Sequence, residues 1–305
     1  MLSIDTLLWP TDFSQGAERA FPHAAALAAG HDAEIHVLNV RDQQGPGEAE
    51  RAAPFPLSRD SLADLLDAAE APARPVDLDA LSLVQAHVDS GSPAAAIVRY
   101  QEAHDIDLTV MGTSGRRGLQ RLLLGSVAEE VVRQAPCPVL TVRAHDEQAA
   151  AWHVDHILTP VDFSEGADQA IRHARELART YEAQITLLHA VEEVMYPSAY
   201  GLEMADLPGP EVLERVDASL AATAQEQSGQ AQVEVESVVG YAPSVILDYQ
   251  AEHDVDLVVI ATHGRTGLER LLLGSVTERI VRRSATPVFV VKPFGKSLLP
   301  GEASE

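Results

Sequence analysis

The feature that most constrains the fold of this chain is an internal repeat. Residues 9–28 align with residues 159–178 at an offset of 150, and residues 100–127 align with residues 249–276 at an offset of 149, with more than half of the second pair identical. A period of this length is that of a whole domain, so the 305 residues encode one unit twice. We predict two domains, residues 1–145 and 152–294, joined by a polar, alanine-rich linker.

Within each copy, short apolar runs alternate with helical patterns. The first copy predicts strands near residues 4–9, 33–40, 80–88, 107–112 and 137–143, and helices near residues 14–29, 58–69, 92–104 and 126–134. This alternation predicts an α/β fold of two tandem doubly wound domains, each a parallel sheet covered by helices on both faces. We expect five strands per domain in the order 3-2-1-4-5, a topology that binds ligands at the carboxyl ends of strands one and four.

The charge of the chain narrows the classes of partner. The sequence has 46 Asp and Glu against 22 Lys and Arg, a formal charge of −24, which disfavours nucleic acid and anionic membranes as partners. An excess of acidic residues, with arginine as the main basic residue, is typical of proteins from halophilic organisms, but it is equally compatible with an ordinary acidic protein. The beginning of the sequence lacks the features of a signal peptide, and no apolar run reaches membrane-spanning length, so we expect a cytoplasmic protein. Cys137 is the only cysteine and is expected to be a buried apolar residue rather than a redox group.

Strand one of each copy ends in the motif Pro-x-Asp-Phe-Ser. Ser14 and Ser164 suit the role of helix caps, and they serve equally as ligand-contacting hydroxyls. For Asp12 and Asp162 we favour a ligand role, because a carboxylate at the switch point can accept a hydrogen bond from an exocyclic amine or a ribose hydroxyl.

Strand four of the first copy runs into a second motif, which contains several glycines. Gly112 and Gly115 are followed, after nine residues, by Gly125 and Ser126. Glycines allow close backbone approach, and the N–H groups of such a turn and of a helix start favour phosphate. A flexible loop before a capped helix is the alternative, but the recurrence of the spacing in the second copy favours phosphate binding. The recurring residues are Ala261, Gly264, Gly274 and Ser275.

These motifs together resemble those of the universal stress protein superfamily in its tandem-domain form. The resemblance implies bound ATP, with or without Mg²⁺, Asp12 contacting adenine or ribose, and the backbone of Val40 or Ala190 facing the base. The implied first site comprises Pro10, Thr11, Asp12, Val40, Met111, Gly112, Gly115, Arg116, Gly125, Ser126 and Val127. The implied second site comprises Pro160, Val161, Asp162, Ala190, Ile260, Ala261, Gly264, Arg265, Gly274, Ser275 and Val276.

The resemblance also implies how the two halves assemble. Members of the superfamily pair through their last strand, so residues 137–143 and 286–292 are expected to form an internal pseudo-dimer. Whether this pair dimerises further stays open, and the sequence names no protein partner. Arg116 and Arg265 are either phosphate ligands or solvated loop charges. Ala261 departs from the motif: with ordinary strand φ it adds only a methyl group near the ribose, and with positive φ it is strained.

Several residues of chemical interest are assigned no part in the site. No lysine follows the glycines, so the motif is not a P-loop and efficient phosphoryl transfer is not predicted. His104 and His253 are expected to end helices, and His23 and His173 to lie on a helix surface. The acidic pairs Asp105/Asp107 and Asp254/Asp256 precede strand four, at the opposite edge, and are expected to solvate loops.

We predict a regulatory protein that binds adenine nucleotide and is not an efficient enzyme. Two alternatives stay open: a slow ATPase or self-phosphorylating protein, suggested by the hydroxyls of Ser126 and Ser275, and a ligand-free scaffold that acts through its acidic surface.

Overall fold

The chain forms ten strands and eight helices in the part that the structure describes. The computed structural model describes residues 2–42, 55–67, 76–113, 124–143, 153–192, 209–227, 232–262, 273–293 and 295–300. The elements of the first lobe are β1 (Thr6–Thr11), α1 (Gln15–His31), β2 (Glu34–Asp42), α2 (Arg59–Asp67), β3 (Leu83–Ser90), α3 (Pro93–Ala103), β4 (Leu108–Gly112), α4 (Ser126–Gln134) and β5 (Val139–Val142). Those of the second lobe are β6 (His156–Pro160), α5 (Glu165–Tyr181), β7 (Gln184–Val191), α6 (Pro210–Gln227), β8 (Val233–Val239), α7 (Ala242–Glu252), β9 (Leu257–Ala261), α8 (Ser275–Arg283) and β10 (Val288–Val291).

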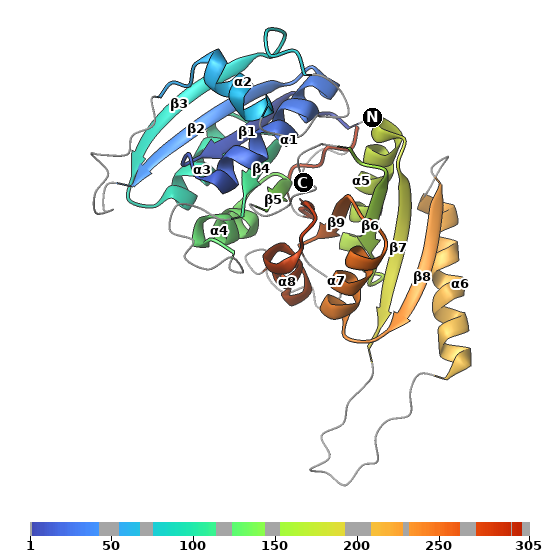
Figure 1. The fold of residues 1–305 in the computed structure, drawn as a ribbon. Coiled ribbons are helices and arrows are strands. Elements are labelled where there is room, and N and C mark those ends of the chain that lie inside the picture. Colours follow the sequence, from blue (N-terminus) through green and yellow to red (C-terminus); the bar gives the residue numbers. More distant parts are fainter. Residues whose placement is uncertain are drawn as a thin grey trace.

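All ten strands belong to one sheet, in the order β3-β2-β1-β4-β5-β10-β9-β6-β7-β8. Each lobe therefore has the predicted order 3-2-1-4-5, and its strand pairs are parallel. The two lobes meet where β5 pairs antiparallel with β10, with Leu140 opposite Phe289. The predicted internal pseudo-dimer is thus confirmed, and Figure 1 shows the two lobes side by side.

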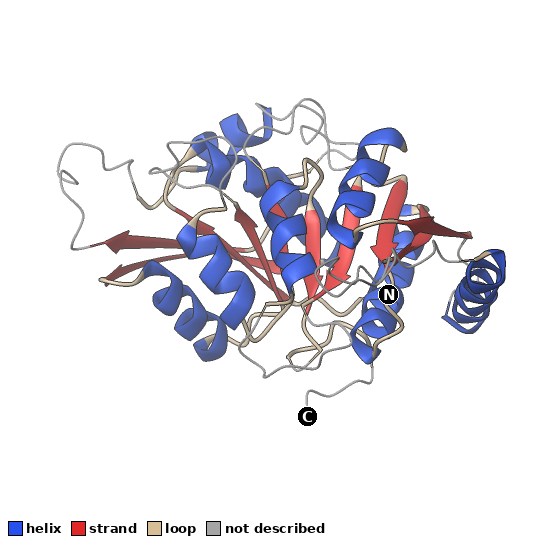
Figure 2. Cartoon of the chain, turned by 90° about the horizontal axis from the view of Figure 1, so that it is seen from below, coloured by secondary structure: helices blue, strands red, loops and turns tan. Residues whose placement is uncertain are grey.

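The helices cover both faces of this sheet, as Figure 2 shows. One hydrophobic core lies under α1, α2, α5 and α6, and a second lies under α3, α4, α7 and α8. Both cores continue across the lobe boundary: Val142 and Phe289 belong to the first, and Val139 and Val290 to the second. Burial of apolar surface is the dominant favourable term in folding, so the lobe boundary is part of the folded core rather than a surface contact.

Local sequence signals set most of the helix ends. Ser14, Ser92 and Ser164 each accept a hydrogen bond from the first turn of α1, α3 and α5, which confirms the capping role. His104 and His253 are the C-caps of α3 and α7, as predicted. The strand ends are set by pairing instead, since β2 continues past the predicted residue 40 to Asp42, which pairs with Ser90 of β3.

The prediction for His23 and His173 is wrong, because both side chains are buried. His173 Nδ1 lies 2.8 Å from the carbonyl oxygen of Gln169, and its Nε2 accepts the N–H of Leu298 at 3.4 Å. Leu298 is buried and belongs to the C-terminal segment, which returns between the lobes (Figure 1). His173 therefore serves as a hydrogen-bonded core residue that fixes this segment.

No helix of the described residues is long and apolar enough to cross a membrane.

Candidate functional site

The motif residues of the first lobe meet at the carboxyl ends of β1 and β4. These strands are neighbours, with Leu8 opposite Thr109, so their ends lie together. The N–H of Gly125 donates to the carbonyl oxygen of Thr113 at 2.7 Å, which places the start of α4 directly behind β4. In the second lobe the N–H of Gly274 donates to the carbonyl oxygen of Thr262 at 2.8 Å. The topological switch point thus brings Asp12, Gly112, Gly125 and Ser126 to the same end of the sheet.

The aspartate of each Pro-x-Asp-Phe-Ser motif is held by its own turn. Asp12 Oδ1 accepts the N–H of Ser14 at 3.0 Å, and Asp162 Oδ1 accepts both the N–H and the hydroxyl of Ser164, at 3.1 and 2.6 Å. The residue between them, Phe13 or Phe163, has a left-handed φ of 57° or 60°. Non-glycine residues seldom adopt this conformation outside functional or tightly constrained turns. The turn fixes the carboxylate at the end of strand one.

A second carboxylate lies close to Asp12. Glu18, in the first turn of α1, has a pKa raised by burial and then by the negative charge of Asp12. The field beside Asp12 is therefore anionic, which suits a hydroxyl or amine donor next to this carboxylate better than a phosphate.

Gly112 is packed tightly against helix α1. A Cβ atom placed on it would lie 2.3 Å from the carbonyl oxygen of Gly16 and 2.8 Å from the N atom of Ala17, both in the backbone of α1. A methyl group at position 112 would therefore meet the backbone of helix α1. In the second lobe Ala261 occupies the same position; it is buried, and its φ is not positive, so the strained alternative does not apply.

The two helices that follow the glycine motifs begin differently from the helices after strand one. The N-caps of α4 and α8 are Gly125 and Gly274, which have no side chain to accept a hydrogen bond. In α1 and α5 a serine hydroxyl fills that role. The first-turn N–H groups of α4 and α8 consequently have no acceptor from an N-cap side chain, and such groups are suited to bind an anion.

One N–H group at the start of each of these helices is used within the fold itself. The N–H groups of Gly125 and Gly274 are used by the carbonyl oxygens of Thr113 and Thr262, so they anchor the helix instead of facing a ligand. The donors that the geometry leaves for an anion are those of Ser126 and the residues after it. The hydroxyl of Thr277 is also used internally, donating to the carbonyl oxygen of Ala261 at 2.7 Å.

An apolar wall completes each site. Val40, Val88 and Val127 are partly buried and pack against the core under α3 and α4, and Ala190, Val238 and Val276 do the same in the second lobe. Val40 follows Asn39, the last residue of β2 that pairs with β1. Its backbone therefore borders the end of β1, where the base is expected. Met111 and Ile260 are buried in the same core and support the wall from behind.

Sequence reasoning missed the residues that hold the end of strand one. Asn39 Nδ2 donates to the carbonyl oxygen of Thr11 at 2.8 Å, and His189 Nδ1 lies 2.6 Å from that of Val161. Each side chain thereby fixes the residue before the motif aspartate. A polar residue near the end of an otherwise apolar strand, repeated at an offset of 150, was the available signal. Pro10 and Pro160 lie within β1 and β6, while Gly115, Arg116, Gly264 and Arg265 lie outside the described residues.

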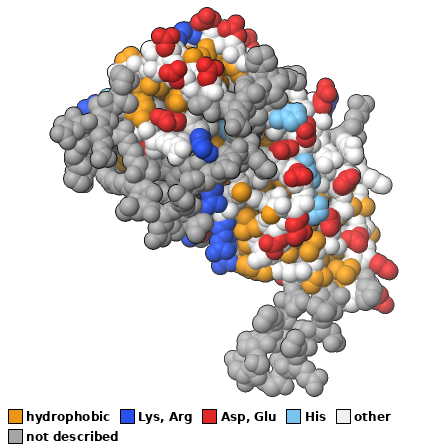
Figure 3. Space-filling model, in the orientation of Figure 1, with side chains coloured by type: hydrophobic (Ala, Val, Ile, Leu, Met, Phe, Trp, Pro, Cys, Tyr) orange, Lys and Arg blue, Asp and Glu red, His pale blue; other side chains and the backbone are white. Residues whose placement is uncertain are grey.

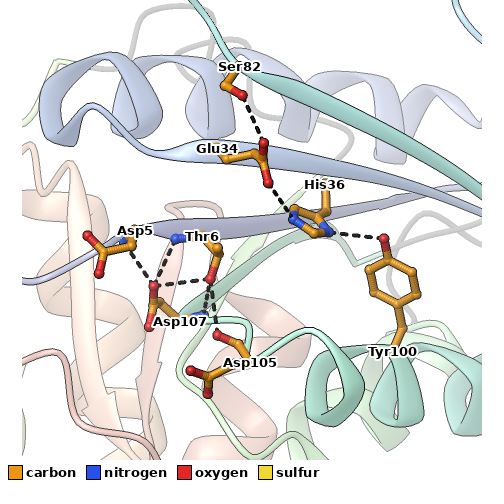
Figure 4. A network of polar contacts seen from close by, with 8 residues as sticks. All are labelled: Asp5, Thr6, Glu34, His36, Ser82, Tyr100, Asp105 and Asp107. Atoms are coloured by element: carbon orange, nitrogen blue, oxygen red, sulfur yellow. Dashed lines mark hydrogen bonds and ion pairs between the residues drawn. The ribbon is translucent and has the colours of Figure 1, made fainter.

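The opposite edge of the sheet carries a polar network, shown in Figure 4. Asp107 is buried and its Oδ2 accepts the N–H groups of Asp5 and Thr6, both at 2.8 Å. Asp256 does the same for Asp155 and His156, at 2.9 Å. The acidic pairs lie at the amino edge as predicted, but their second members are structural ties between strands rather than solvating loop charges.

Nearby, His36 bridges Glu34 and the hydroxyl of Tyr100, with contacts of 3.1 and 3.0 Å (Figure 4). Burial lowers the pKa of His36, and Glu34 partly offsets this.

Comparison with known proteins agrees with this geometry. The model of the universal stress protein family matches residues 3–143 and again residues 153–292. The chain belongs to the universal stress protein family. The family's domain is thus present twice, on the two lobes that β5 and β10 join.

Individual proteins are similar to this chain in sequence or in fold. The universal stress protein Rv2005c of Mycobacterium tuberculosis is 31% identical over 196 residues, which span 62% of this chain and 63% of the relative. A universal stress protein from Archaeoglobus fulgidus has a similar fold at 20% identity, with a TM-score of 0.62 over 94% of this chain and 98% of that one. A Pseudomonas aeruginosa protein, 21% identical, gives a TM-score of 0.65 over 95% and 93%.

Proposed function

We propose that this chain binds two adenine nucleotides, one at each switch point, and acts as a nucleotide-binding regulatory protein. The observation that carries the proposal is the pair of glycine-capped helices, α4 and α8, which begin beside the residues that follow β4 and β9. Backbone N–H groups and the positive end of the helix dipole together favour a phosphate.

The remaining parts of the site suit the other parts of a nucleotide. The apolar wall of Val40, Val88 and Val127 offers a surface for the base. Asp12, fixed by its turn and next to Glu18, offers an acceptor for a ribose hydroxyl or an amino group. Base, sugar and phosphates thus each have a matching surface at the carboxyl ends of the strands, and the second lobe repeats the arrangement.

A proline substitution tests the phosphate contact without removing the helix. Gly125 has φ −65° and ψ 141°, and Gly274 has φ −59° and ψ 141°, both suitable for a residue before proline. Proline is well tolerated at the first position of a helix and removes one N–H group there. Ser126→Pro and Ser275→Pro therefore each delete one phosphate donor from one site.

The test is titration calorimetry with ATP, ADP, AMP and cyclic AMP. The unsubstituted chain should bind two equivalents, and each proline variant should lose about tenfold or more in affinity at one site, the effect expected for a hydrogen bond to a charged group. Ser126→Ala and Ser275→Ala are the matched controls, because they remove the hydroxyl and keep the N–H. Retention of both sites in the double proline variant, or no nucleotide binding by the unsubstituted chain, refutes the proposal.

A further inference from the structure

The last strand of each lobe is followed by a cation that reaches into the other lobe. Lys292 follows β10, and its ammonium donates to the carbonyl oxygens of Val132 and Arg133, the latter at 3.2 Å, at the end of α4. Arg143 follows β5 and donates to the carbonyl oxygens of Arg283 and Ser284, at 2.7 and 3.2 Å, at the end of α8. The antiparallel pairing of β5 with β10 makes these contacts reciprocal.

Both cations occupy the position where a helix favours positive charge. The last carbonyl groups of a helix have no partner within it and carry the negative end of its dipole. Lys292 is 8% exposed and Arg143 is partly buried, so each donates directly to backbone in surroundings where hydrogen bonds are strong. The end of each helix is therefore held by a side chain from the other lobe.

A side-chain contact joins the same two helices directly. Arg282 of α8 contacts Glu278 within its own helix at 2.9 Å and Glu129 of α4 at 3.5 Å. Figure 3 shows basic side chains gathered over α8 on a face where acidic ones are otherwise common. The helices α4 and α8 are thus linked at the lobe boundary as well as capped across it.

We infer that Lys292 and Arg143 are positioning residues, each of which sets the phosphate-binding helix of the opposite lobe. The inference rests on the proposed function. Each helix has nine residues, which makes it a rigid rod about 14 Å long. Its first turn faces the phosphate and its last turn is fixed by the other lobe. Release of the last turn allows the rod to tilt, and the N–H groups at its far end lose their alignment.

The test measures each site in a background where the other site is weakened by its proline substitution. In the Ser275→Pro chain, Lys292→Met should weaken ATP binding at the first site by about three- to tenfold, in keeping with the strength of a cation at a helix end. In the Ser126→Pro chain, Arg143→Met should weaken the second site equally. Lys292→Arg and Arg143→Lys keep the positive charge. Their ATP affinities should stay within about twofold of those of the Ser275→Pro and Ser126→Pro chains, respectively.

Two further readouts separate positioning from other causes. At about 0.15 M salt the Debye length is about 8 Å, so loss of a charge about 14 Å from the phosphates of ATP changes affinity by less than about twofold through space. A larger loss that Arg restores therefore requires the direct contact. Hydrogen exchange of the bonded N–H groups at the start of α4, those of Gly125 and Glu129, should quicken in Lys292→Met and stay unchanged in Arg143→Met. A purely structural role for Lys292 would weaken the site of its own lobe instead.

The outcomes distinguish this inference from the proposed function. If the unsubstituted chain binds no ATP, the proposed function fails. If it binds two ATP and Lys292→Met leaves the first site within twofold of its background, or weakens only the second site, the inference fails and the proposed function stands.

Discussion

Replacing Gly112 by alanine tests whether the packing of helix α1 against β4 builds the first site. The new Cβ atom would lie 2.3 Å from the carbonyl oxygen of Gly16 and 2.4 Å from its carbonyl carbon. Ordinary contacts of this kind are about 3.5 Å, so the backbone of α1 has to retreat by about 1 Å. Trp9 opposes that movement, since its buried ring donates to the carbonyl oxygen of Ala17 at 2.8 Å.

The expected loss of stability follows from two opposing effects. Overpacking of a core costs about 1–3 kcal/mol. Alanine in place of glycine at an ordinary φ recovers about 0.4–1 kcal/mol by restricting the unfolded chain. Gly112→Ala should therefore lower the free energy of unfolding by about 1–2 kcal/mol. Because α1 begins directly after the turn that holds Asp12, its retreat should also weaken ATP binding at the first site by about tenfold.

The second lobe supplies a matched control at the equivalent position. Ala261→Gly removes one buried methyl group and adds backbone freedom, which together cost about 1–2 kcal/mol, but it requires no movement of α5. The two variants should thus be similarly destabilised, while only Gly112→Ala loses nucleotide affinity.

Urea unfolding without nucleotide measures the packing effect, and calorimetry in the Ser275→Pro and Ser126→Pro backgrounds measures the two sites. An unchanged free energy of unfolding for Gly112→Ala would refute the packing argument. Destabilisation with full affinity at the first site would refute the link between α1 and the site.

Three further predictions concern buried polar groups at the lobe boundary. Gln101 Oε1 is buried and has no partner among the described residues, whereas the equivalent Gln250 Oε1 accepts the hydroxyl of Ser284. Ala135 is the equivalent of Ser284, so Ala135→Ser should raise the free energy of unfolding by about 1 kcal/mol in urea titrations. Burial raises the pKa of Cys137 to about 11, and its thiol should resist iodoacetamide at pH 8 until the chain is unfolded; rapid labelling of the folded chain would contradict this. Burial lowers the pKa of Lys292 from 10.5 to about 8, so the unfolded chain binds more protons than the folded chain between these pH values. The free energy of unfolding of the unsubstituted chain, relative to that of Lys292→Met, should therefore rise by up to about 3 kcal/mol as the pH increases from 8 to 10.5. A flat difference between these two chains over that range would show that the pKa is not lowered.

The sequence by itself determined the features that depend on local pattern. The repeat gave two lobes, the alternation of strands and helices gave the doubly wound order, and the serine caps at Ser14, Ser92 and Ser164 gave three helix starts. These signals lie within a few residues of the structure that they specify, because capping and periodicity act over one or two turns. The switch-point motifs could therefore be placed at the correct edge of the sheet.

Only the tertiary structure decided which atoms of those motifs face the site. The contact between Gly112 and Gly16, and the use of the Gly125 N–H by Thr113, depend on how closely separate elements pack. The burial of His173 and the crossing of Lys292 into the first lobe depend on segments more than a hundred residues apart. Such contacts between distant residues are set by how whole helix and sheet faces pack against a shared core, and the local sequence pattern does not predict them.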